Sequence, residues 1–193
     1  MSLNINDRTA LVVIDVQQGF EDAAWWGPRN NPDCEANIEL LLAEWRNGQR
    51  PIVFVQHSST NPLSPLHPSN PGHALKVFVS GEPDLLVDKS VNSSFHGTPD
   101  LHDWLQSNTI SSLVICGITT NHCCETTARV AGNLGYQVFF ALDATHTFDR
   151  KDVDGGNVHA AELSRITGVN LHEEFATVVN TQSLLANRTS RTR

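Results

Sequence analysis

The chain has 193 residues, of which 39% are hydrophobic and 18% are charged. This composition is typical of a folded, soluble protein, and the length predicts one domain spanning residues 1–193. The formal net charge of −8 disfavours nucleic acid and anionic membranes as partners, because a phosphate-binding surface needs clustered Lys and Arg. The basic segment 187–193 is interpreted as a solvated tail.

The start of the chain lacks a basic segment followed by a long apolar stretch, so no signal peptide is predicted. No apolar run approaches the ~20 residues that a membrane helix requires. Four cysteines at irregular spacing do not make a disulfide framework in a chain of this length. We therefore expect a cytoplasmic protein in a reducing compartment.

Short β-branched apolar runs alternate with amphipathic stretches along the chain. The apolar runs predict strands, in chain order at residues 9–14, 51–55, 84–87, 112–116, 137–142 and 176–179. The apolar spacing and the capping residues between them predict helices at residues 33–46, 99–106, 121–134 and 158–166. The polar, Pro-rich segment 57–72 has no such period and is predicted to be a long loop.

This alternation predicts βαβ units with right-handed crossovers. We therefore expect an α/β fold in which a single doubly wound domain has a mostly parallel, six-stranded sheet with helices on both faces. Its core should span about residues 8–180. Because sheets of this kind bind ligands at the carboxyl ends of their strands, functional residues are expected directly after the predicted strands.

Reactive side chains follow three of these strands. Asp15 comes directly after the first strand, and Lys89 follows the short apolar run that includes Val87. Cys123 and Cys124 lie in the first predicted turn of the helix after strand 112–116. Taken singly, Asp15 could be a helix cap and Lys89 a surface residue. If the side chains converge in a dry cleft, the Lys–carboxylate pair can set the charge state of a neighbouring nucleophile.

The two cysteines allow different interpretations. The first turn of a helix lowers the pKa of a thiol and offers N–H groups that can hold an oxyanion. A buried, inert cysteine is nevertheless the commoner state. Cys123 and Cys124 differ by about 100° around a helix, so that one can face a cleft while the other packs inward.

The histidines and glycines give no support for a metal or a cofactor. His57, His67 and His73 share the predicted loop, but no Asp-x-His or His-x-Glu pair accompanies them. The glycine patterns of nucleotide-binding loops are absent. No metal and no cofactor are therefore predicted.

Three segments, residues 10–20, 89–98 and 116–129, resemble the isochorismatase-like cysteine hydrolase superfamily in the order that the family has. This family includes nicotinamidases, N-carbamoylsarcosine amidohydrolase and isochorismatase itself. The resemblance covers roughly residues 8 to 180. It implies a Rossmann-like fold of the isochorismatase type and, because relatives commonly form dimers or tetramers, a homo-oligomer.

The resemblance also assigns roles to single residues. It implies that Cys123 is the nucleophile, Asp15 its acidic partner and Lys89 the family's lysine, while Cys124 packs inside. It further implies a cis peptide at Ile118–Thr119, with the N–H groups of Thr119 and Cys123 forming the oxyanion hole. The residues predicted to bind substrate are Phe20, Trp25, His57 and Ile118. Trp25 and the adjacent Trp26 could instead belong to a subunit interface.

The chemistry implied is hydrolysis of a carbon–nitrogen bond in a small amide or ureido compound through a Cys123 thioester. Nicotinamidases of the family hold a metal through an Asp-x-His pair after the second strand. Here Val55 stands at the Asp position of that pair, before His57. The departure argues against a metal and against nicotinamide as the substrate.

Two alternatives stay open. One is hydrolysis of a vinyl ether, as in isochorismatase-type members, although these lack the nucleophilic cysteine. The other is a non-catalytic thiol redox sensor or binding module, in which Cys123 and Cys124 would form a vicinal disulfide.

Overall fold

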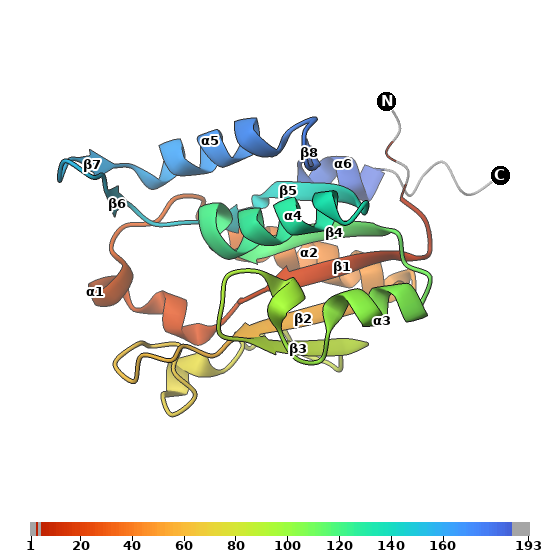
Figure 1. Cartoon of the computed structure of the whole chain (residues 1–193), viewed down its shortest axis with the longest axis horizontal. Coiled ribbons are helices and arrows are strands. Elements are labelled where there is room, and N and C mark those ends of the chain that lie inside the picture. The colour runs from red at the N-terminus through yellow and green to blue at the C-terminus, as the bar shows by residue number, and fades with distance from the viewer. Residues whose placement is uncertain (1–2, 4, 187–193) are drawn as a thin grey trace.

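The computed structural model describes residue 3 and residues 5–186, so the predicted tail at 187–193 lies outside the described residues. Six strands form one sheet in the order β3-β2-β1-β4-β5-β8 (Figure 1). The strands are β1 (Thr9–Ile14), β2 (Ile52–His57), β3 (Leu85–Lys89), β4 (Ser112–Ile118), β5 (Gln137–His146) and β8 (Thr177–Val179). Every neighbouring pair in this sheet is parallel. The predicted α/β, doubly wound fold is confirmed.

Helices cover both faces of the sheet (Figure 1). The helices are α1 (Ala23–Trp26), α2 (Cys34–Asn47), α3 (Leu101–Ser107), α4 (Glu125–Asn133), α5 (Ala160–Leu171) and α6 (Thr181–Ala186). Alternate residues of β1 enter two hydrophobic cores. Leu11 and Val13 pack with buried residues of α2 and α6, and Ala10 and Val12 pack with those of α3, α4 and α5. The central strands β1 and β4 are buried throughout, as expected of strands covered on both faces.

Several elements differ from the predicted ones. The helix predicted at 121–134 begins as a π-helical turn (Thr120–Cys124), α5 extends to Leu171 rather than ending at 166, and β5 continues to His146. The sequence patterns did not predict α1, α6 or the antiparallel hairpin of β6 (Arg150–Lys151) and β7 (Asn157–Val158). These missed elements have only two to six residues, which is too short for a periodic pattern to develop.

Short 3-10 turns occur at Gln18–Glu21, Pro71–His73 and Ser94–His96, the second of them overlapping the end of the predicted 57–72 loop. Among the described residues, none of the helices combines the length and the apolar character needed to cross a membrane.

Candidate active site

The carboxyl ends of β1, β3 and β4 bring three reactive side chains together, at the edge of the sheet where β1 leads toward α1 in Figure 1. Asp15 follows β1, Lys89 is the last residue of β3, and Cys123 lies in the π-helical turn after β4. The Lys89 ammonium donates to Asp15 Oδ2 at 2.6 Å and to Cys123 Sγ at 3.5 Å. The three side chains therefore converge in the structure.

A close approach between the ends of β1 and β4 positions Asp15. Gly117 has φ +128°, and a Cβ at this position would lie 2.1 Å from Ile14 O, so only glycine fits. Asp15 itself has φ +52°, in the left-handed region that non-glycine residues rarely adopt. Its N–H donates to Val55 O at 2.9 Å, which ties this strained residue to the end of β2. Such backbone strain is typical of functional sites.

The Asp15–Lys89 pair is fully buried, with both side chains at 0% exposure. Burial alone would lower the pKa of Lys89, but the adjacent Asp15 carboxylate outweighs it and the pKa is raised. Lys89 is therefore a stable ammonium ion. Asp15 Oδ1 has no hydrogen-bond partner within the described part of the chain. One carboxylate oxygen thus remains available to take a proton.

Cys123 is a thiol in the resting site. Burial raises the pKa of Cys123, the Asp15 carboxylate raises it further, and Lys89 acts in the opposite direction. The sequence argument expected a lowered pKa at a helix start, whereas desolvation and the neighbouring carboxylate raise the pKa of this thiol. Cys123 Sγ donates to Asn92 Oδ1 at 3.6 Å. A thiol of this kind needs a base at the moment of attack.

His57 stands beside the Lys89 ammonium. Lys89 Nζ lies 3.4 Å from His57 Nδ1. Burial lowers the pKa of His57 and the Lys89 charge lowers it further, so the imidazole is neutral at neutral pH. Gln17 fixes the His57 backbone on both sides, accepting from its N–H at 2.8 Å and donating to its carbonyl at 3.0 Å. Gln17 is thus a positioning residue that no sequence signal identified.

A small cavity of about 100 Å³ opens onto these residues. Its lining consists of Asp15, Phe20, Trp26, His57, Leu66, Asn92, Thr119, His122, Cys123 and Arg150. Of the residues predicted to bind substrate, Phe20 and His57 belong to this lining. Trp25 and Ile118 do not: Trp25 is 45% exposed, and Ile118 is fully buried in the core on the α2 side. Trp26 takes the place predicted for Trp25, because its ring packs 4.8 Å from that of Phe20.

The segment that begins the π-helical turn faces the cavity. The Ile118–Thr119 peptide is cis. The Thr119 carbonyl accepts from His122 N at 3.3 Å and from Cys124 N at 3.2 Å, which ties the turn together. Cys124 is fully buried in the hydrophobic core on the α3 side, away from the cavity. The two adjacent cysteines thus occupy different environments.

Among the described residues, Asp15, His57 and Cys123 form the one group whose ligand atoms are close enough to hold a metal, within 4.8 Å of one another. The Lys89 ammonium contacts all three of these side chains. A metal cation would be repelled by this fixed positive charge, so the group fits proton transfer better than metal binding. His73 bonds Ser58 at 2.9 Å and does not join the group.

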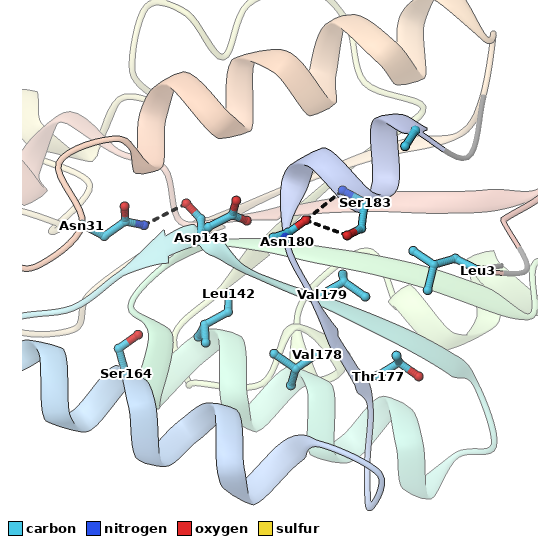
Figure 2. A pocket seen from close by; sticks show the side chains of 11 residues that line it. Leu3, Asn31, Leu142, Asp143, Ser164, Thr177, Val178, Val179, Asn180 and Ser183 are labelled. Carbon is cyan, nitrogen blue, oxygen red and sulfur yellow. Dashed lines mark hydrogen bonds between the residues drawn. The ribbon is translucent and has the colours of Figure 1, made fainter. Parts of the chain in front are cut away.

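A larger hollow, of about 840 Å³, lies elsewhere, between β8, α5 and α6 (Figure 2). Its one carboxylate, Asp143, accepts from the N–H and the hydroxyl of Thr181 and so caps α6. The Asp143 carbonyl accepts from Asn31, and Asn180 accepts from Ser183 (Figure 2). Among the described residues that line this hollow, none is a nucleophile paired with a base, so the small cavity is the candidate active site.

The family model for the isochorismatase domain matches residues 9–183. The chain belongs to the isochorismatase family and is an isochorismatase-family hydrolase. It is similar to a solved structure of an isochorismatase-family hydrolase from Chromobacterium violaceum, with a TM-score of 0.91 and 36% identity. That match covers 98% of this chain and 97% of the other.

Relatives with sequence similarity include an isochorismatase family protein of Bacillus subtilis, YrdC, which is 40% identical over 94% of this chain and 96% of the relative. Nicotinamidase 3 of Arabidopsis thaliana is 30% identical over 91% of this chain and 86% of the relative. Ureidoacrylate amidohydrolase RutB of Variovorax paradoxus is 28% identical over 84% and 77%. The predicted family resemblance is confirmed, and some relatives act on amide or ureido bonds.

Proposed function

We propose that the protein hydrolyses a carbon–nitrogen bond of a small amide or ureido compound through a thioester on Cys123. The observation that carries this proposal is the dry contact of Lys89 with both Asp15 and Cys123. A protonated, buried thiol beside a carboxylate with a free oxygen has its general base at hand. The similarity to a nicotinamidase and to a ureidoacrylate amidohydrolase supports the same type of reaction.

In the first half of the reaction, the Cys123 proton passes to Asp15 as Sγ attacks the carbonyl carbon of the substrate. The Lys89 ammonium stabilises the sulfur as its charge develops. The backbone N–H groups of Thr119 and Cys123 hold the oxyanion of the tetrahedral intermediate. Asp15 then gives its proton to the leaving nitrogen, the carbon–nitrogen bond breaks, and ammonia or an amine departs from the thioester.

In the second half, water donates a proton to Asp15 as its oxygen attacks the thioester carbon. The carbon–sulfur bond breaks, the acid product leaves, and Asp15 returns the proton to Cys123. Asp15 thus serves as base and acid in turn, in the way that the histidine of a Ser-His-Asp triad does.

The test is ammonia release from a panel of primary amides and ureido acids by the wild type, Cys123→Ala and Cys124→Ala. We expect Cys123→Ala to lose turnover by about 10⁴-fold or more, because the covalent step is removed. Cys124→Ala is the matched control, one residue further along the chain and outside the cavity. It should keep most of its turnover. Turnover that survives in Cys123→Ala would refute the thioester.

A further inference from the structure

Arg150 is a cation in the candidate active site that lacks a counterion. It lines the same small cavity as Cys123, from strand β6 of the β6–β7 hairpin. No carboxylate of the described residues lies within salt-bridge distance of its guanidinium, and its buried Nε has no hydrogen-bond partner among them. A buried polar atom without a partner is costly unless a ligand completes it.

The nearby carboxylates are committed to other groups. Asp149, the preceding residue, accepts from Ala160 N at 2.8 Å and from His159 at 3.1 Å. Glu125 accepts from Arg129 at 2.7 Å and from Thr167 at 2.6 Å. Neither forms a salt bridge with Arg150, so an anion that pairs with this guanidinium would have to come from outside the described residues.

Among the described residues, the one that makes a side-chain hydrogen bond with Arg150 is His122, a neutral group. Arg150 Nη2 lies 3.4 Å from His122 Nδ1. Burial lowers the pKa of His122 and the Arg150 charge lowers it further, so His122 accepts this hydrogen bond as an uncharged imidazole. The contact fixes the guanidinium without cancelling its charge.

The rest of the cavity is electrically balanced. The Asp15 carboxylate is paired with Lys89, while Cys123 is a thiol and His57 a neutral imidazole. The remaining wall is apolar, formed largely by Phe20, Trp26 and Leu66. The net charge that a substrate meets is therefore the single positive charge of Arg150.

We propose that Arg150 binds a carboxylate of the substrate, so that the protein acts on small amide or ureido acids that carry the scissile carbonyl and an anionic group in one molecule. This inference rests on the proposed function. The planar guanidinium can pair with a carboxylate through two parallel hydrogen bonds, a geometry that lysine cannot reproduce. Arg150 is thus a specificity residue, separate from the groups that move the proton.

The experiment compares anionic probes with neutral molecules of the same shape. Succinamate is paired with 4-methylpentanamide, and N-carbamoylglycine with isobutylurea; in each pair an isopropyl group replaces the carboxylate. Binding to Cys123→Ala is measured by calorimetry, so that no probe is consumed. We expect at least one carboxylate to bind about 10- to 100-fold more tightly than its neutral counterpart, the range of a charged hydrogen bond.

Three further variants assign the preference to Arg150. Adding Arg150→Met to Cys123→Ala should abolish the preference for the carboxylate. Adding Arg150→Lys instead should retain only part of this preference. Adding Lys151→Gln should leave it unchanged, because this exposed neighbour on the same hairpin removes an equal charge outside the cavity. Thermal melting of Arg150→Met separates binding from structure: loss of an unpaired, half-buried cation should not lower the melting temperature.

The outcomes distinguish the two proposals. A preference that survives Arg150→Met, equal binding of both members of each pair, or no binding of either carboxylate overturns the role of Arg150. Wild-type turnover is measured on the same probes. Arg150-dependent binding without turnover of a bound carboxylate would support the anion site and contradict the proposed hydrolysis. Turnover of the probes without any preference for the carboxylate would support the proposed hydrolysis and contradict the anion site.

Discussion

The Asp15–Lys89 pair at the end of the sheet and the ion-pair network around Glu35 at the start of α2 differ in how fully their polar atoms are bonded. Arg29 donates to both oxygens of Glu35 at 2.7 Å, and Lys76 donates to Oε1 at 2.7 Å. At the candidate active site, by contrast, Asp15 Oδ1 has no partner among the described residues.

The pKa values follow from this difference. Burial raises the pKa of Glu35, but the hydrogen bonds from Arg29 and Lys76 outweigh it and hold the pKa at about 2. The network therefore keeps its charge and contributes to stability at neutral pH. The Asp15–Lys89 pair leaves an oxygen available beside a thiol, which is what proton transfer requires. Both oxygens of Glu35 are thus held in ion pairs, whereas one oxygen of Asp15 has no partner among the described residues.

The largest expected effect comes from breaking the active-site pair. Lys89→Met leaves the Asp15 carboxylate buried without a counterion, and we expect turnover to fall by roughly 10³-fold or more. The free energy of unfolding should fall by about 3 kcal/mol. Ammonia release and urea unfolding measure the two effects. If turnover fell less than tenfold, Lys89 would have no part in the reaction.

Removing the whole pair separates stability from catalysis. In Asp15→Asn/Lys89→Met no charge is left unpaired, so the free energy of unfolding should return to within about 1 kcal/mol of the wild type. Turnover should stay lost, because the base is absent. The double-mutant cycle measures the coupling between the residues. Recovery of turnover in the double variant would contradict the assigned base.

The network should show the opposite behaviour. Glu35→Gln should lower the free energy of unfolding at pH 7 by about 2–3 kcal/mol, since the folded pKa of about 2 lies well below the ordinary value of 4.5. Turnover of the folded enzyme should change little, because Glu35 does not line the cavity. A loss of turnover as large as that expected for Lys89→Met would mean that the Glu35 network also takes part in the reaction.

The pH dependence sharpens this contrast. Because folding lowers the pKa of Glu35, its stabilisation is complete above the unfolded value and is lost as the pH falls from about 4.5 towards 2. Unfolding measured at pH 7, 4 and 3 should show that the difference between wild type and Glu35→Gln shrinks over this range. If the difference in unfolding free energy between wild type and Glu35→Gln grew on acidification, the lowered pKa of Glu35 would be contradicted.

The smallest effects separate the two tryptophans. Trp26→Leu removes a ring from the cavity wall and should raise KM by about tenfold, the order of one hydrophobic subsite. The matched Trp25→Leu changes a ring that is 45% exposed, and the free energy of unfolding should stay within about 0.5 kcal/mol of the wild type. Steady-state kinetics measure KM for both variants, and urea unfolding measures their stability. An equal rise of KM in both variants would place Trp25 at the substrate as well.

Much of the fold followed from local pattern. The six strands were predicted within a few residues of their ends, because buried parallel strands such as β1 and β4 are continuous β-branched runs. The π-helical turn at Thr120–Cys124 was not predicted, since apolar spacing does not distinguish i→i+4 from i→i+5 bonding. The homo-oligomer and the cytoplasmic location stay predictions.

The sequence by itself determined the order of the strands along the chain and the candidates Asp15, Lys89 and Cys123, because parallel strands end at one edge and motif spacing is local information. Only the tertiary structure decided which residues complete the site. Asn92 comes from the loop after β3, Trp26 from the end of α1 and Arg150 from a short hairpin, and their meeting depends on packing. The charge state of Cys123 was also decided there, because desolvation depends on what surrounds the thiol and not on its neighbours in sequence.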